Sequence, residues 1–262
     1  MDKYDLSGRR AAIIIRGGGR PGDEYDVERV TKICQQNSFP EFGDWISFST
    51  KKELIDALKS FRDKLDGDTG MLMVTIMAHG TLGHIEVNDV ENLELEEIYQ
   101  LFNNRQCPAL REKPKLFLVQ ACRNVKGHSK NPNTDGSVQH SPLQKKLLPT
   151  LSDSMEVYAV FPDKFAGRRP DKGSPLFEEM EKVFNQDSVS KHHMYELFTK
   201  VNERLGQRTY AKGEYECDHA ILSERLSKLQ LQSQILSDNV DNDSKIGRSL
   251  HIVSSLTKKL YL

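Results

Sequence analysis

Short apolar runs alternate with amphipathic segments along most of this chain, and this alternation constrains the fold more than any other feature. Continuous apolar runs are typical of strands buried on both faces of a parallel sheet. Apolar side chains at helical spacing between these runs indicate helices that pack on the sheet. The pattern therefore predicts an α/β fold with a mostly parallel central sheet and helices on both faces. We expect strands at 11–15, 45–49, 71–78, 115–120, 155–160 and within 251–262. We expect helices at 23–36, after Ser49 or Thr50, and at 93–102, 174–185 and 189–205, with Asp23 as the cap of the first.

Composition excludes several classes of protein. Lysine and arginine total 37 against 38 aspartate and glutamate residues, which argues against bulk binding to nucleic acid or an anionic membrane. No apolar run approaches the roughly 18 residues of a membrane span, and the polar start is unlike a signal peptide. The 4 cysteines form no CxxC pair, which argues against a disulfide framework or a zinc site. We expect a cytoplasmic protein with access to the nucleus and with no cofactor or metal.

Reactive side chains follow two of the expected strands. His79 and Gly80 come after residues 71–78, and Cys122 comes after residues 115–120. If these parallel strands are neighbours, a thiol and an imidazole meet at one sheet edge, as nucleophilic catalysis requires. The N–H groups of Gly80 and Cys122 would then hold an oxyanion. A single histidine and a single cysteine after strands are also ordinary structural features, so the residues alone leave both interpretations open.

The neighbouring residues make the pattern more specific. Met77-Ala78-His79-Gly80 and Gln120-Ala121-Cys122-Arg123 resemble the caspase family of cysteine peptidases. Further matches follow in the same order along the chain, at 20–26, 105–117, 165–174 and 252–261. The resemblance covers nearly the whole chain apart from 125–147 and 210–247. Residues 3–8 and the C-terminal segment are most similar to the short-prodomain branch that acts in keratinocyte cornification.

The resemblance implies a caspase-like three-layer sandwich and cleavage after aspartate. A pocket for the aspartate at P1, the residue before the cut bond, needs planar cationic donors. Arg20, Gln120 and Arg168 match the positions that supply them in the family. Arg169 is a competitor of Arg168, and Arg16 is a weaker competitor of Arg20.

The resemblance also implies the roles of the residues around the thiol. His79 assists the transfer of the Cys122 proton, and the backbone of Ala166, Gly167 and Arg168 pairs with the substrate. Gly167 stands where relatives carry an aromatic wall, which predicts a wide S2 pocket. A second departure is Asn124, where the family pattern has glycine.

The family pattern divides the chain into a large-subunit region, a linker and a small-subunit region within one catalytic domain. These regions cover residues 1–124, with His79 and Cys122, 125–149, and 150–262, with the second arginine and a dimer strand. We expect a zymogen that is cut after Asp135 in the linker. Only about nine residues precede the first strand, which resembles the short-prodomain members.

The C-terminal strand predicts a homodimer, because an uncovered sheet edge readily pairs with another strand. The alternative is a monomer whose edge is shielded by Lys258 and Lys259. Leucines within 219–236 lie on one helical face and cover local core or form a partner-binding or self-inhibiting helix.

Three functions remain in competition at this point. The first is an aspartate-specific cysteine endopeptidase that acts on protein substrates in programmed cell death or differentiation. The second is a catalytically impaired regulator that binds caspases or their substrates, and Asn124 keeps it open. The third is a nucleotide-binding module built on residues 17–22, which is weak because the glycine spacing fits neither phosphate-binding motif.

Overall fold

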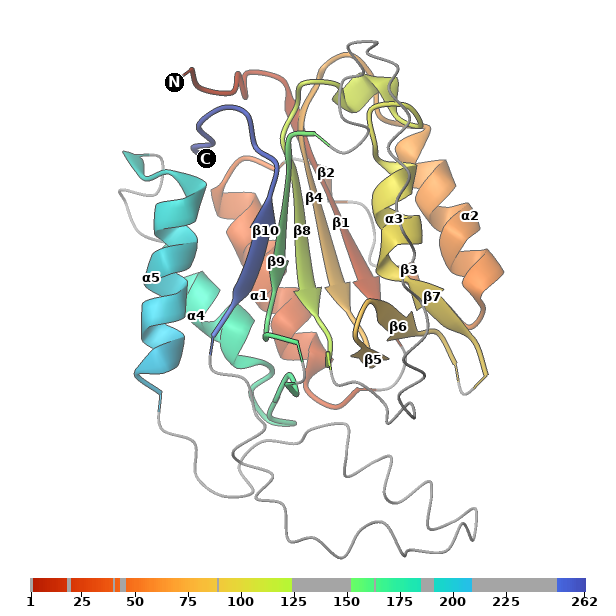
Figure 1. Cartoon of the computed structure of the whole chain (residues 1–262), viewed down its shortest axis with the longest axis vertical. Coiled ribbons are helices and arrows are strands. Elements are labelled where there is room, and N and C mark those ends of the chain that lie inside the picture. Colours follow the sequence, from red (N-terminus) through yellow and green to blue (C-terminus); the bar gives the residue numbers. More distant parts are fainter. Residues whose placement is uncertain are drawn as a thin grey trace, which may run out of the picture.

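One mostly parallel sheet runs through the middle of the molecule (Figure 1). The computed structural model describes residues 2–17, 20–39, 41–42, 46–88, 90–123, 152–162, 164–184, 191–208 and 249–262. The strands of the sheet follow the order β10-β9-β8-β4-β1-β2, and β3 also pairs with β1. They are β1 (Arg9–Arg16), β2 (Glu41–Phe42), β3 (Ile46–Ser47), β4 (Thr69–Met77), β8 (Lys115–Gln120), β9 (Ser154–Tyr158) and β10 (His251–Ser254). Only β10, at the edge, is antiparallel to its neighbour among these described strands.

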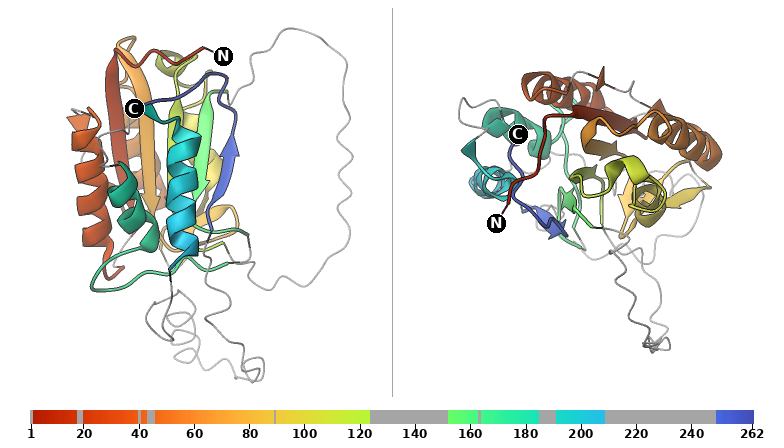
Figure 2. Two further views of the ribbon diagram at one scale, coloured as in Figure 1. Left: turned by 90° about the vertical axis from the view of Figure 1, so that its left-hand side faces the viewer. Right: turned by 90° about the horizontal axis from the view of Figure 1, so that it is seen from above.

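Helices cover both faces of this sheet, as Figure 2 shows. On one face lie α1 (Asp23–Gln36), α4 (Pro175–Phe184) and α5 (Met194–Gly206), and on the other lie α2 (Lys51–Arg62) and α3 (Leu95–Leu101). Each face has its own apolar core, and every residue of β4 is buried between them. The predicted α/β sandwich is therefore confirmed. In the described part of the chain, no helix is both long and apolar enough to cross a membrane.

The helix predicted after Ser49 or Thr50 begins with a capping box. The Thr50 hydroxyl accepts a hydrogen bond from the Glu53 N–H at 3.2 Å, and the Glu53 carboxylate accepts one from the Thr50 N–H at 3.2 Å. This reciprocal pair satisfies N–H groups that have no partner inside the helix. Leu54 and Leu58 then turn one face of α2 into the core, where both are fully buried. The cap and the apolar face together explain why this segment folds as a helix.

The start of α1 differs from the prediction. Its bounds, Asp23–Gln36, agree with the predicted 23–36, but Gly22 rather than Asp23 occupies the cap position. Gly22 has a φ of 89°, a backbone conformation that favours glycine. A Cβ at this position would lie 2.4 Å from the Arg169 carbonyl oxygen, so the close approach of the two loops also requires glycine. Asp23 is consequently the first helical residue and lies inside the fold.

The predicted helix over 93–102 is wrong at its start. Residues Asn92–Glu94 form β7, which pairs with β6 (His84–Glu86), and β6 pairs with β5 (Gly80–Thr81) in a second small sheet. Leu93 is buried between two exposed neighbours, which is the alternation of a strand rather than of a helix. The helix α3 begins only at Leu95.

Several other boundaries are shorter than predicted. The strand expected over 45–49 is β3 (Ile46–Ser47), with Trp45 outside the described residues. The helix expected over 189–205 is α5, which begins at Met194 after its cap at His193. In the C-terminal segment, only His251–Ser254 pairs with β9. The chain then turns to the N-terminal segment, where the Tyr4 N–H donates to the Lys259 carbonyl at 3.0 Å. This contact holds both chain ends at the amino ends of the parallel strands (Figure 1).

Candidate active site

The carboxyl ends of β4 and β8 carry the two predicted reactive residues. These strands are parallel neighbours, with Met77 opposite Gln120, and the Ala78 N–H donates to the Gln120 carbonyl at 3.2 Å. His79 and Cys122 each follow their paired strand end by two positions, so they leave the sheet at the same edge. The structure therefore meets the condition on which the pairing of this thiol and imidazole depends.

Gly80 packs tightly beside the nucleophile candidate. A Cβ on Gly80 would lie 2.5 Å from the His84 carbonyl oxygen and 3.5 Å from the Cys122 carbonyl oxygen. The first distance is shorter than real Cβ contacts, so a side chain here would push the β5–β6 hairpin away. Glycine thus allows the His79-Gly80 backbone to approach the backbone of Cys122.

The Cys122 thiol lies beside the loop that follows β9. Its sulfur accepts a hydrogen bond from the Ala166 N–H at 3.3 Å, and the Arg123 N–H donates to the Lys164 carbonyl at 3.0 Å. Cys122 is buried, whereas His79 is partly exposed. Residues 164–168 therefore line one side of the thiol.

The three predicted carboxylate-binding residues are brought together. Arg20, Gln120 and Arg168 are 2%, 1% and 1% exposed. Arg20 Nη1 donates to the Gln120 carbonyl oxygen at 3.2 Å. Arg168 Nε donates to the Pro21 carbonyl oxygen at 3.1 Å, next to Arg20. Because guanidinium groups form strong charge-assisted hydrogen bonds with carboxylates, this cluster is suited to a carboxylate ligand.

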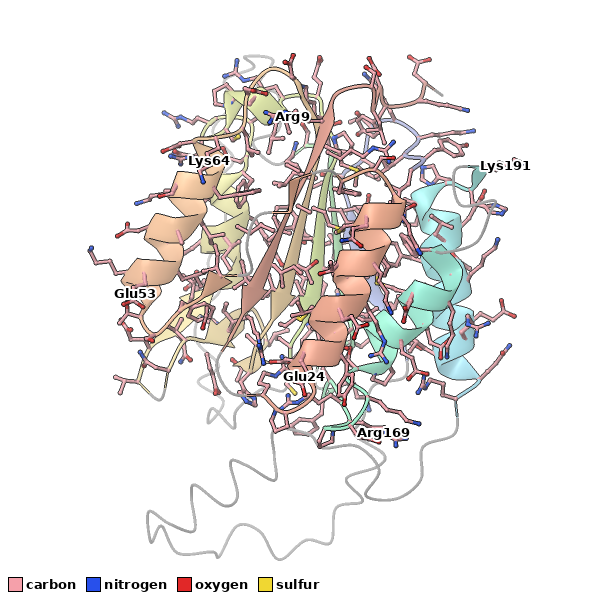
Figure 3. The ribbon with its side chains drawn as sticks, turned by 180° about the vertical axis from the view of Figure 1, so that it is seen from behind. Arg9, Glu24, Glu53, Lys64, Arg169 and Lys191 are labelled. Atoms are coloured by element: carbon pink, nitrogen blue, oxygen red, sulfur yellow. The ribbon has the colours of Figure 1, made fainter. Side chains whose placement is uncertain are left out.

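The two competing arginines have other positions. Arg169 Nε and Nη2 donate to the two carboxylate oxygens of Asp171 at 3.0 and 2.9 Å. Figure 3 shows Arg169 at the same end of the molecule as Glu24. The Arg16 side chain ends β1 and is 26% exposed. The placement favours Arg168 over Arg169 and Arg20 over Arg16.

Comparisons with known proteins agree with this arrangement. A family model described as the caspase domain matches residues 9–237. The chain belongs to the caspase family. Caspase-14 of Homo sapiens is 30% identical over 214 residues, which cover 79% of this chain and 85% of that protein. Caspase-2 of Gallus gallus is 34% identical over 176 residues, which cover 62% of this chain and 41% of that protein.

Solved structures confirm the caspase fold. Caspase-1 from Spodoptera frugiperda has a TM-score of 0.71 and 18% sequence identity, and the match covers 100% of this chain and 95% of that one. The predicted caspase resemblance is confirmed, and the relatives place the chain close to caspase-14. Family and fold together support a cysteine peptidase, and the caspase homologues support a role in apoptosis or differentiation.

One member of the arginine cluster that the sequence prediction missed is Asp23. It is fully buried, with its carboxylate 3.9 Å from Arg20 Nε and 3.8 Å from Arg16 Nε. Burial raises the pKa of Asp23, while the charges of Arg20, Arg168, Arg16 and His79 act to lower it. The prediction used Asp23 only as a helix cap, because no local pattern reveals that a first-turn acid is buried.

Arg123, the residue after Cys122, was also missed. Its guanidinium lies 4.0 Å from the centroid of the Tyr158 ring, and its Nη1 lies 2.5 Å from His251 Nδ1. The His251 ring stacks between Tyr158 and Phe161, with centroid distances of 5.7 and 5.4 Å. Burial and the Arg123 charge lower the pKa of His251, which favours the neutral ring that accepts this hydrogen bond. The edge strand β10 is thereby joined to the residue beside the thiol.

The remaining predicted positions are divided between the described loop and the rest of the chain. Ala166 and Gly167 are buried in the loop beside the thiol. Asn124 and Asp135 lie outside the described residues, as does the leucine-bearing segment 219–236.

Proposed function

We propose that this chain is an endopeptidase that cuts peptide bonds after aspartate, with Cys122 as the nucleophile and His79 as the general base. The observation that carries the proposal is the buried cluster of Arg20, Gln120 and Arg168 beside the strand ends that bear His79 and Cys122. Two buried guanidinium groups attract an anion of the size of a side-chain carboxylate. Membership of the caspase family supports the same substrate.

The chemistry follows from the roles of these groups. His79 takes the thiol proton, and the Cys122 sulfur attacks the carbonyl carbon of the P1 aspartate. The N–H groups of Gly80 and Cys122 stabilise the oxyanion. The imidazolium then gives its proton to the leaving amine as the C–N bond breaks, which leaves a thioester. Water, deprotonated by His79, hydrolyses the thioester and restores the thiol.

The wall beside the thiol determines how the peptide is held. The backbone of Ala166, Gly167 and Arg168 pairs with the extended substrate, while the Arg168 side chain faces the P1 acid. Gly167 adds no side chain to the neighbouring pocket, so we expect tolerance of large residues at P2.

A direct test compares matched tetrapeptides that end in aspartate or in the neutral isostere asparagine. We expect kcat/KM to be at least about a thousandfold higher for the aspartate peptide, because a neutral side chain cannot form the charge-assisted hydrogen bonds that a carboxylate makes with guanidinium groups. Cys122→Ala should abolish cleavage of both peptides. Cys34→Ala is the matched control, because Cys34 is a free buried thiol within α1 and outside this site. Equal activity of the wild-type protein and Cys122→Ala would contradict the proposal.

Asn124 stands where the family pattern has glycine, and this departure keeps a second candidate open. The candidate is a catalytically impaired regulator that binds caspases or their substrates. Such a protein would bind the aspartate peptide with the same charge preference and leave it intact. Measuring binding and cleavage on one peptide pair therefore separates the two functions.

We also infer a homodimer through β10. Support comes from the edge position of this strand and from Val253, a large apolar side chain that is 44% exposed on it. Sedimentation should show a dimer for the wild-type protein and a monomer for Val253→Glu. A monomeric wild-type protein would instead favour the edge shielded by Lys258 and Lys259.

Activation by a cut after Asp135 in the linker 125–149 and residence in the cytoplasm complete the proposal. An aspartate followed by small residues, as in Asp135-Gly136-Ser137, is a suitable site for an enzyme of this specificity. Mass spectrometry of the active protein should find two fragments, divided after Asp135. An intact chain in the active protein would contradict this step.

A further inference from the structure

Asp23 is a buried acid inside the arginine cluster, and the proposed reaction does not use it. Its side chain is 0% exposed. Oδ1 lies 3.9 Å from Arg20 Nε, and Oδ2 lies 3.8 Å from Arg16 Nε. Both distances exceed a hydrogen bond, and neither oxygen has a hydrogen-bond partner among the residues that the structure describes. A buried carboxylate without hydrogen bonds is costly, so its retention in the cluster calls for an explanation.

The charges around Asp23 give that explanation. Arg20 and Arg168 supply two positive charges to the cluster, and both act on the Asp23 carboxylate. Asp23 offsets one of them. Arg16, whose side chain is 26% exposed, contributes its charge from the solvent side. The positive charge that a substrate carboxylate encounters in the cluster is therefore already partly offset by Asp23. The negative charge of Asp23 also repels the substrate carboxylate directly.

We propose that Asp23 is a specificity-determining residue, whose carboxylate competes with the P1 aspartate for the arginine cluster and weakens the preference for an acidic P1 side chain. The inference rests on the proposed function, because it assigns this cluster to the P1 residue. Stabilisation of the start of α1 does not by itself explain a buried acid at position 23. The helix dipole favours any acid in that turn, and exposed Glu24 is available for this purpose.

Replacing Asp23 by asparagine removes the charge and keeps the size of the side chain. We expect the preference for aspartate over asparagine at P1 to rise about tenfold, which corresponds to about 1.4 kcal/mol. The matched control is Glu24→Gln, which makes the same change in charge one residue later on the surface of the same helix turn (Figure 3). This control should leave the preference unchanged.

The experiment measures binding, so it does not depend on turnover. Tetrapeptide amides that end in aspartate or asparagine are titrated calorimetrically into the full chain carrying Cys122→Ala. The Asp23→Asn and Glu24→Gln substitutions are then added to this background. Asp23→Ser provides a second neutral residue that is compatible with a helix start, and circular dichroism verifies that each variant is folded.

Each outcome decides the inference. A rise in the aspartate preference in Asp23→Asn or Asp23→Ser, but not in Glu24→Gln, supports it. An unchanged preference assigns Asp23 to the helix alone, and a reduced preference makes it a positioning partner of Arg20, so either result overturns the inference. Loss of folding in both neutral variants also overturns it, because Asp23 would then be structural. If the Cys122→Ala background itself does not prefer aspartate, the proposed function fails first, and this result is distinct from all the others.

Discussion

Buried polar groups are arranged differently at the two ends of the central sheet. At the amino ends of the parallel strands, the carboxylate of Asp153 accepts three hydrogen bonds. They come from the hydroxyls of Tyr4, Ser152 and Thr257 at 2.6, 2.7 and 2.5 Å. The Thr257 N–H in turn donates to the Tyr4 hydroxyl at 2.9 Å. Every member of this group has a protein partner, as a group that serves stability requires.

At the carboxyl ends of the same strands, buried polar atoms lack such partners. Arg20 Nε, Gln120 Oε1 and both carboxylate oxygens of Asp23 have no hydrogen-bond partner among the described residues. Native proteins satisfy nearly all of their buried polar groups, so each exception requires an explanation, of which a bound ligand is one. The comparison indicates that one end of the sheet is built for stability, while the other keeps polar atoms without protein partners, as the proposed substrate site requires.

The largest expected effect that tests this difference is a loss of peptidase activity when the cluster at the carboxyl ends of the strands is altered. Arg20→Met should lower kcat/KM for the aspartate peptide roughly a thousandfold, equivalent to about 4 kcal/mol, because one of two buried donors of the P1 cluster is lost. The free energy of unfolding should fall by no more than about 3 kcal/mol, because Asp23 loses one of the positive charges around it but keeps those of Arg16 and Arg168. Peptide kinetics and urea denaturation measure the two quantities.

Arg169→Met is the control for this prediction. It removes a guanidinium at the same end of the molecule, but this guanidinium is paired with Asp171 and lies outside the cluster. Activity should stay within about threefold of the wild-type value. A large loss of stability in Arg20→Met with activity retained would reverse the roles assigned to the two ends.

The second effect is on stability at the amino end. Asp153→Ala should lower the free energy of unfolding by about 4 kcal/mol, because the buried hydroxyls of Tyr4 and Ser152, together with the Thr257 hydroxyl, lose their acceptor. Asp153 also has a φ of 62°, a conformation that alanine adopts less readily than aspartate or asparagine. Activity per folded molecule should be unchanged, as measured by active-site titration after urea denaturation curves have established the folded fraction. Asp153→Asn, which keeps an acceptor and the backbone preference, should lose less than half as much.

The third effect is on the pH dependence of the free energy of unfolding, to which two buried acids contribute with opposite sign. Burial raises the pKa of Asp26 from 3.8 to about 6, although it accepts a hydrogen bond from the Ser174 N–H at 2.8 Å. Burial also acts to raise the pKa of Asp153, but hydrogen bonds from Thr257 and Tyr4 lower it overall. A raised pKa means that the folded chain holds the proton more tightly than the unfolded chain. The stability from Asp26 is therefore present below pH 3.8 and is lost as the pH rises through about 6.

The sign is reversed for Asp153, whose stabilisation is present above its unfolded pKa and is lost as the pH falls. Asp26→Asn should thus gain stability relative to the wild-type protein between about pH 4 and pH 7, by up to about 3 kcal/mol. Asp153→Asn should show the opposite trend, and at lower pH: its difference from the wild-type protein should change only as the pH falls below about 4. Urea denaturation at a series of pH values measures both differences, and parallel curves for the two variants would contradict the assignment.

Features that rest on local pattern were predicted from the sequence. The bounds of α1 and β8 agree with the predicted 23–36 and 115–120, because a continuous apolar run and a helical apolar stripe are both local signals. From the sequence, the adjacency of β4 and β8 was only a condition, and the structure meets it: β4 pairs with β8, which places His79 and Cys122 at one sheet edge.

Features that depend on distant contacts were not predicted. β5, β6 and β7 contain two or three residues each, too few for a periodic signal. The burial of Asp23 depends on the loop around Arg168, which lies far away in the sequence, and the pairing of Arg123 with His251 joins equally distant segments. The resemblance to caspases, rather than any local pattern, identified Arg168 as a member of the carboxylate cluster.

The contact between the two chain ends determines what a cut within residues 124–151 would do. Lys3 forms a β-bridge with Lys259, and the Tyr4 hydroxyl donates a hydrogen bond to Asp153. The first residues of the chain are therefore bonded to residues that follow the cut. Further along, β8 and β9 are joined by the parallel register from Lys115 to Val119. Two polypeptides produced by such a cut would remain in contact at two places, the paired chain ends and the β8–β9 pair. They would therefore stay together as a heterodimer without a covalent link. Severing the backbone there would create a new pair of termini while leaving the sheet, and with it the arginine cluster, in one piece.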